Sequence, residues 1–148
     1  MKIQRMTRQH LDGVLKIENE CFSHPWTREN LENELNNPAS VFFTALENDE
    51  VIGYIGMSTV IDEGYIFNVA VTASQRKKGI GSALIGEIVT YCKKNNFAFV
   101  TLEVRQSNQK AISLYSHFGF IKVGERKSYY RDPEENAILM TKILNGET

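Results

Sequence analysis

Hydrophobic periodicity predicts a short strand at residues 2–5, followed by two helices. The residues that recur at helical spacing along one face of the first helix are Leu11, Val14, Leu15, Glu18 and Cys21. The second helix is expected to begin after Thr27, a favourable N-cap residue, and to end before Pro38. Trp26 and Leu31 occupy the two positions of a hydrophobic staple at its start.

From residue 40 onwards the pattern becomes that of extended chain. Two apolar runs, SVFFTAL and VIGYIGMSTV, flank a polar turn at residues 47–50 and predict a hairpin. YIFNVAV predicts a third strand. The segment that follows predicts a helix that ends at residues 93–96, and FAFVTLEV predicts a buried strand. SNQKAISLYSHFGF predicts a helix with Gly119 as its C′ residue, and FIKVGERKSYY and NAILMTKIL a final strand pair. This order predicts one α/β domain over residues 1–148, with a mixed sheet covered by helices on both faces.

The composition of the chain limits the classes of partner and the cellular compartment that we expect. The 17 Lys and Arg residues are balanced by 18 Asp and Glu, for a net charge of −1, which argues against a nucleic-acid-binding protein. Two cysteines and three scattered histidines give no metal-site spacing, so we expect no metal. The start of the chain has no apolar leader-like segment, and no run reaches membrane-spanning length. We therefore expect a cytoplasmic protein with no membrane partner.

The stretch SQRKKGIGSAL places three cations, residues 76–78, before Gly79 and Gly81 at the start of a helix. A P-loop requires a different spacing, and a dinucleotide fingerprint requires a small residue where Leu84 stands. Glycines allow close approach of a ligand to the backbone, and a helix N-terminus favours anions. The pattern alone leaves two interpretations open: a phosphate site or a solvated basic turn.

This segment resembles motif A of the GNAT acetyltransferases, Q/R-x-x-G-x-G/A, at Arg76, Gly79 and Gly81. The later stretch resembles motif B of the same family, N-x-x-A-x-x-L-Y-x-x-x-G-F. Its matching residues are Asn108, Ala111, Leu114, Tyr115, Gly119 and Phe120. The resemblance covers nearly the whole chain and implies the GNAT fold, with acetyl-CoA as co-substrate. The implied acetyl-CoA contacts are Val69, Ala70, Val71, Arg76, Lys77, Lys78, Gly79, Ile80, Gly81, Ser82 and Asn108.

Within the family, CFSHPW, FNVAV, LEVRQSN and YYRDPEENAILM are similar to the RimI-type ribosomal-protein-alanine N-acetyltransferases. This resemblance implies transfer of acetyl to the α-amine of an N-terminal alanine, with a small-subunit ribosomal protein as partner and direct attack in a ternary complex. The alternatives are a lysine or small-molecule amine as acceptor, and a module that binds acetyl-CoA or a partner without turnover. We expect a monomer or a weak dimer.

Two residues are candidates for the acid–base chemistry. Strand alternation puts Glu103 opposite Leu102 and Val104, where it is either functional or in an ion pair with Arg105 or a lysine. The resemblance implies that Glu103 is the general base, acting directly or through water. The hydrophobic pattern predicts that Tyr115 is a core aromatic residue, whereas the resemblance implies that Tyr115 donates a proton to the coenzyme A sulfur.

The remaining candidates have a structural alternative beside each functional one. Asn108 is either a helix cap or a cofactor contact. Trp26, Tyr129 and Tyr130 are candidates for a groove that holds an extended peptide, although Trp26 also fits as a helix staple. Both cysteines are expected to be structural, so we expect no covalent intermediate.

Overall fold

The computed structural model describes residues 1–144, so the last four residues of the predicted 1–148 domain lie outside the described part. The strands are β1 (Lys2–Arg5), β2 (Ser40–Glu47), β3 (Glu50–Val60), β4 (Glu63–Val71), β5 (Phe99–Arg105), β6 (Ile121–Tyr130) and β7 (Glu135–Ile143). The α-helices are α1 (Leu11–Cys21), α2 (Arg28–Leu35), α3 (Ile80–Lys94) and α4 (Gln109–His117). Short 3₁₀ turns, η1 (Arg8–His10) and η2 (Ala73–Gln75), precede α1 and follow β4. The predicted order of elements is confirmed.

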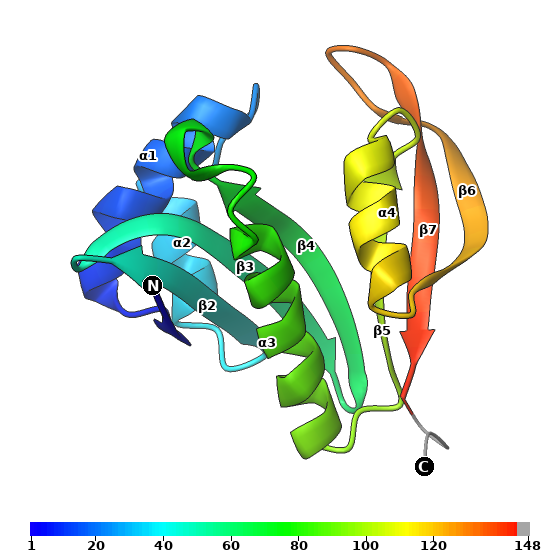
Figure 1. The fold of residues 1–148 in the computed structure, drawn as a ribbon, viewed down its shortest axis with the longest axis horizontal. Coiled ribbons are helices and arrows are strands. Elements are labelled where there is room, and N and C mark those ends of the chain that lie inside the picture. The colour runs from blue at the N-terminus through cyan, green and yellow to red at the C-terminus, as the bar shows by residue number, and fades with distance from the viewer. Residues whose placement is uncertain (145–148) are drawn as a thin grey trace.

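Within residues 1–144 the strands form one seven-stranded mixed sheet, in the order β1-β2-β3-β4-β5-β7-β6. The neighbouring pairs are antiparallel except β4 and β5, which are parallel and joined by the crossover helix α3. Helices α1 and α2 lie on one side of the sheet and α3 and α4 on the other (Figure 1). The α/β mixed-sheet architecture predicted from the sequence is therefore confirmed.

Each face of the sheet has its own apolar core. On the α3 face, Leu84, Ile85 and Ile88 are fully buried against the sheet. On the α1 and α2 face, a second cluster contains Val14 and Leu31, with α1 contributing a stripe of apolar side chains at helical spacing. These two cores hold the strands that carry the candidate site.

Local capping signals are realised as the sequence predicts. Thr27 Oγ1 accepts a hydrogen bond of 3.1 Å from the Asn30 N–H at the start of α2. Trp26 and Leu31 belong to the same apolar cluster, as a staple requires. Gly119 has a φ of +91° just after α4, the left-handed conformation that favours glycine at this position.

The feature that shapes the site is the separation of β4 from β5. The two strands pair only from Glu63 with Phe99 to Ile66 with Leu102. Beyond Ile66 a bulge in β4 shifts its register against β3, and β5 continues alongside β7 instead. The two strands therefore diverge toward their carboxyl ends, and Figure 1 shows this opening beside α4.

Candidate active site

The first candidate site is a cradle at the N-terminus of α3. Gly79 has a φ of +79°, which turns the chain into the helix, and the first helical hydrogen bond runs 3.0 Å from the Ala83 N–H to the Gly79 carbonyl. The N–H groups of Ile80, Gly81 and Ser82 precede that bond and point out of the helix start. A cavity of about 230 Å³ lies there, lined by Val71, Gln75, Arg76, Lys77, Gly79, Ile80, Gly81, Ser82 and Leu114.

The electrostatics of this cradle favour an anion. Helix N-termini carry partial positive charge, and three cationic side chains precede this one. Arg76 Nε donates to the Val71 carbonyl at 3.1 Å, and Lys78 Nζ donates to Gln75 Oε1 at 3.2 Å. Within residues 1–144 neither forms a salt bridge with a carboxylate, so their charge is available to the cradle. The geometry and the charge both fit a diphosphate group.

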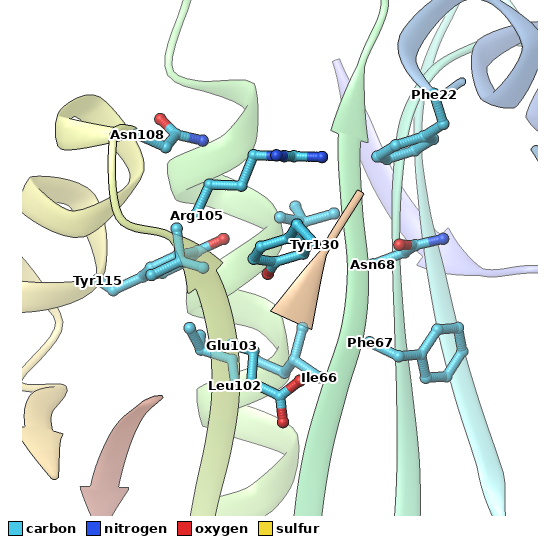
Figure 2. Close-up of a pocket in the computed structure, with 12 residues that line it drawn as sticks. Phe22, Ile66, Phe67, Asn68, Leu102, Glu103, Arg105, Asn108, Tyr115 and Tyr130 are labelled. Atoms are coloured by element: carbon cyan, nitrogen blue, oxygen red, sulfur yellow. The ribbon is translucent and has the colours of Figure 1, made fainter. Parts of the chain in front are cut away.

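The second candidate site is a cavity of about 290 Å³ in the opening between β4 and β5. Figure 2 shows side chains from both strands, from α4, from the loop after α1 and from the end of β6 converging on it. His24 and Asp132 connect the loops on either side, with 2.7 Å between Nε2 and Oδ2. The lining residues are Phe22, Ile66, Phe67, Asn68, Val69, Leu102, Glu103, Val104, Arg105, Asn108, Tyr115 and Tyr130.

The two cavities adjoin along the same elements. On β4, Val71 lines the cradle and Val69, two residues earlier, lines the second cavity. On α4, Leu114 lines the cradle and its neighbour Tyr115 lines the second cavity. Because residues two apart on a strand are about 6.6 Å apart, one elongated ligand can occupy both cavities.

Glu103 lies on the face of β5 opposite to Leu102 and Val104, as strand alternation predicts. Its side chain is only 7% exposed. Oε2 accepts a hydrogen bond of 2.9 Å from the Tyr65 hydroxyl, and Oε1 lies 3.3 Å from Arg126 Nε. Burial, followed by hydrogen bonds that include the one to Glu103, raises the pKa of Tyr65.

The ion pair suggested from the sequence therefore forms with a different partner. Arg105 does not pair with Glu103; it lies 3.3 Å from Glu135 instead and stacks over the Tyr130 ring at 4.5 Å. Arg126 reaches Glu103 from β6, a strand that the local sequence around Glu103 does not reveal. Glu103 is thus both paired and on the wall of the cavity.

Tyr115 is at the same time a core residue and a cavity residue. It is 6% exposed, its ring lies 5.9 Å from that of Phe120, and burial raises its pKa to about 12. A phenol with this pKa stays protonated at neutral pH, so it is available as a donor. Asn108 likewise has both roles, since its Oδ1 caps α4 through Ala111 N–H at 3.2 Å while its side chain lines the cavity.

A buried polar group beside the cavity was not recognised from the sequence as functional. Glu18 on α1 is 1% exposed and accepts hydrogen bonds from the Tyr54 hydroxyl, from the Trp26 backbone N–H at 3.0 Å and from Asn68 Nδ2 at 3.3 Å. Burial raises the pKa of Glu18, and the hydrogen bonds from Tyr54 and Trp26 oppose that rise. The signal in the sequence was a glutamate within the apolar stripe of a helix.

Four predicted residues do not line either cavity. Ala70 is buried in the core on the α1 face, and Lys78 is directed toward Gln75. Trp26 packs behind the second cavity, with its ring 5.6 Å from that of Phe67. Tyr129 is half-exposed, and a hydrogen bond to Glu103 raises its pKa.

The cysteines have the environments of structural residues. Cys92 is fully buried in the α3 core, and burial raises its pKa to about 12. Cys21 ends α1, and burial raises its pKa despite a 3.2 Å contact with Arg76. Both therefore favour the thiol over the nucleophilic thiolate.

Residues 1–144 contain neither a metal-binding cluster nor a membrane-spanning helix. No group of three or more His, Cys, Asp or Glu side chains in this part of the chain is arranged to hold a metal ion. None of the helices described here has the length and apolar character needed to cross a bilayer.

The sequence and the fold are similar to those of known proteins. The sequence profile of the acetyltransferase (GNAT) family matches residues 11–120. The [ribosomal protein bS18]-alanine N-acetyltransferase of Haemophilus influenzae is 34% identical over 136 residues, which are 90% of this chain and 92% of that protein. A Bacillus subtilis relative, whose name gives the same activity provisionally, is 33% identical over 144 residues, 97% of this chain and 95% of that protein.

Among solved structures, the ribosomal-protein-S18-alanine N-acetyltransferase from Escherichia coli has a TM-score of 0.91 and 28% identity, covering 99% of this chain and 96% of that one. The predicted family and the predicted resemblance to RimI-type proteins are confirmed by these matches. With its two adjoining cavities and its match over residues 11–120, this chain belongs to the GNAT acetyltransferase family.

Proposed function

We propose that this protein transfers an acetyl group from acetyl-CoA to the α-amine of an N-terminal alanine, and that its acceptor is a ribosomal protein of the bS18 kind. The observation that carries the proposal is the junction of the two cavities, where Glu103 and Tyr115 line the wall next to the anion cradle. The names of relatives that match more than 90% of the chain support the acceptor.

In the proposed complex the diphosphate of acetyl-CoA occupies the cradle at Gly79, Ile80, Gly81 and Ser82. The outward N–H groups and the cations of residues 76–78 supply the binding energy there. The rest of the cofactor follows β4 from Val71 toward Val69, and acetyl-CoA supplies an activated thioester. Main-chain N–H groups of β4 beyond the last pair with β5 are in a position to orient it.

The acceptor amine attacks the thioester carbonyl carbon, so that a C–N bond forms and the C–S bond breaks. Glu103 takes the proton that the amine loses, directly or through a water molecule, since its oxygens have capacity beyond Tyr65 and Arg126. Tyr115 donates its proton to the departing thiolate, and its raised pKa keeps that proton in place until transfer. The products are an N-acetyl peptide and coenzyme A.

An α-amine is the acceptor that needs the least deprotonation by this site. With a pKa near 8, about a tenth of it is neutral at pH 7, whereas fewer than roughly one in a thousand lysine side chains are neutral. The opening between β4 and β5 is suited to an extended chain end, and Figure 2 shows the ring of Tyr130 between the two strands. We assign the protein to the cytoplasm, where ribosomal proteins are made.

A panel of peptides tests the proposal. Peptides with an N-terminal alanine and blocked lysines are expected to be acetylated, and the same peptides with a blocked N-terminus and free lysines are not. Intact mass and fragment-ion mass spectrometry locate the acetyl group. Acetylation of lysines or small amines alone, in the absence of N-terminal acetylation, would refute the acceptor while leaving the family unchanged.

A further inference from the structure

We propose that Asn68 is a substrate-positioning residue whose side-chain oxygen accepts a hydrogen bond from an N–H group at the amino end of the acceptor peptide. This inference rests on the proposed N-terminal acetylation and extends it to the acceptor side of the cavity. It follows from the direction of the Asn68 side chain, from its hydrogen bonds and from its place on the cavity wall.

The bulge in β4 directs this side chain. Regular alternation from Tyr65 would put Asn68 on the α3 face with Ile66, but the register shift lies between these two residues. Phe67 and Asn68 consequently both face α1 and α2, where the Phe67 ring packs against Trp26 and Asn68 reaches Glu18.

A glycine on the neighbouring strand makes this bulge possible. Gly56 pairs with Asn68, and a Cβ on Gly56 would lie 2.6 Å from Phe67 Cζ and 2.7 Å from Phe42 Cε1. The Phe67 ring therefore occupies the space that a side chain at position 56 would need, so glycine at this position accommodates the bulge.

The buried hydrogen bonds determine which end of the Asn68 amide faces inward. Asn68 Nδ2 lies 3.0 Å from the Tyr54 hydroxyl oxygen and 3.3 Å from Glu18 Oε2. Tyr54 donates its own hydroxyl proton to Glu18, so both neighbours of Asn68 accept hydrogen bonds. The amide nitrogen has to face them, since the reverse orientation would place Oδ1 against two acceptors.

The amide oxygen is thereby turned toward the cavity. Figure 2 shows Oδ1 of Asn68 on the side nearer Tyr130, with the nitrogen on the far side. Asn68 lines the cavity opposite Tyr115 and Asn108 of the α4 side. Within residues 1–144 this oxygen has no hydrogen-bond partner, so it is an acceptor held rigidly in the opening.

The chemistry of the acceptor peptide supplies a matching donor. An extended N-terminus offers two kinds of N–H group near the reacting centre, those of the α-amine and that of the first peptide bond. A fixed carbonyl-type oxygen that accepts from either one orients the amine toward the thioester. Glu18 and Tyr54 are positioning residues in this arrangement, because they act only through the Asn68 amide.

The test compares Asn68→Ala with Asn95→Ala, a matched asparagine variant at the end of α3, whose Nδ2 donates to the Tyr91 carbonyl. For an N-terminal alanine peptide, Asn68→Ala is expected to lower kcat/KM about tenfold, mainly by raising the peptide KM. The KM for acetyl-CoA is expected to stay within about twofold of the wild type in both variants. Each enzyme is also assayed with a peptide methylated on its first peptide-bond nitrogen.

The methylated peptide identifies the donor. If methylation lowers the rate of the wild type but not that of Asn68→Ala, the donor is the first peptide N–H; if it lowers both equally, the donor is the α-amine.

The inference is overturned if Asn68→Ala has the same kcat/KM for the peptide as Asn95→Ala, or if the KM of Asn68→Ala for acetyl-CoA rises as much as its KM for the peptide. If Asn68→Ala does not fold, Tyr54→Phe tests the inference instead. This substitution frees the Asn68 amide to rotate and is expected to raise the peptide KM several-fold. A wild-type enzyme inactive on every N-terminal peptide would instead refute the proposed function.

Discussion

The left-handed turn at the start of α3 provides a clean test of the anion cradle. Gly79 has a φ of +79°, and a Cβ added there would meet nothing within 4 Å. Gly124 on β6 is also open to an added Cβ, with nothing within 4 Å, but its φ lies outside the left-handed region. Alanine at each of these positions therefore changes the same atoms, and the two variants differ in backbone strain.

The difference in stability between the two variants follows from this geometry. Replacing glycine with alanine removes freedom from the unfolded chain and is worth about 0.4–1 kcal/mol in either variant. Alanine in the left-handed region costs roughly 1–2 kcal/mol, and this cost applies to Gly79→Ala alone. The unfolded-state contribution cancels in the comparison, so Gly79→Ala should be less stable than Gly124→Ala by about 1–2 kcal/mol, or about 2–8 °C in Tm.

Urea unfolding followed by circular dichroism measures this difference, and steady-state kinetics measure its effect on the cradle. If the backbone of Gly79→Ala relaxes out of the left-handed region, the N–H groups that follow turn away from the diphosphate. The KM for acetyl-CoA is then expected to rise in Gly79→Ala and to stay unchanged in Gly124→Ala. Equal stabilities and equal KM values for the two variants would refute both the strain argument and the assignment of the cradle.

Three further predictions concern the acid–base groups. Glu103→Gln is expected to retain acetyl-CoA affinity by calorimetry and to lose about a hundredfold in kcat; unchanged kcat would remove it from the mechanism. Tyr115→Phe should behave similarly, and a loss of acetyl-CoA binding instead would point to a packing role. The Tm is expected to stay constant up to pH 10 and to fall as the pH rises toward 12. Four buried or partly buried tyrosines have a higher pKa in the folded than in the unfolded protein, so unfolding releases protons above pH 10. A constant Tm over this range, measured by calorimetry, would contradict this prediction. The four tyrosines are Tyr54, Tyr65, Tyr115 and Tyr130.

Several features of the site were predictable because they depend on residues close together in the chain. The glycines at the start of α3 and the cap residues Thr27 and Asn108 act through backbone groups a few residues away. Alternation along β5 was enough to place Glu103 opposite Leu102, since side-chain direction in a regular strand repeats every two residues. The order of elements followed from the same local periodicities.

Other features depend on which distant strands meet. The partner of Glu103 is Arg126 rather than Arg105 because β7 lies between β5 and β6 and sets their register. Tyr65 reaches Glu103 because β4 pairs with β5 at this level. Neither register can be read from the residues of one strand, so the sequence identified the carboxylate but not its neighbours.

The sequence by itself determined the kinds of elements, their order and the two motifs that carry the family resemblance. Tertiary structure alone decided that β4 separates from β5, that a bulge turns Asn68 toward α1, and that Glu18 holds it there. The physical reason is that one extra residue in a strand reverses the face of every side chain after it. Long-range pairing and packing select the position of that residue, here with Gly56 making room for Phe67.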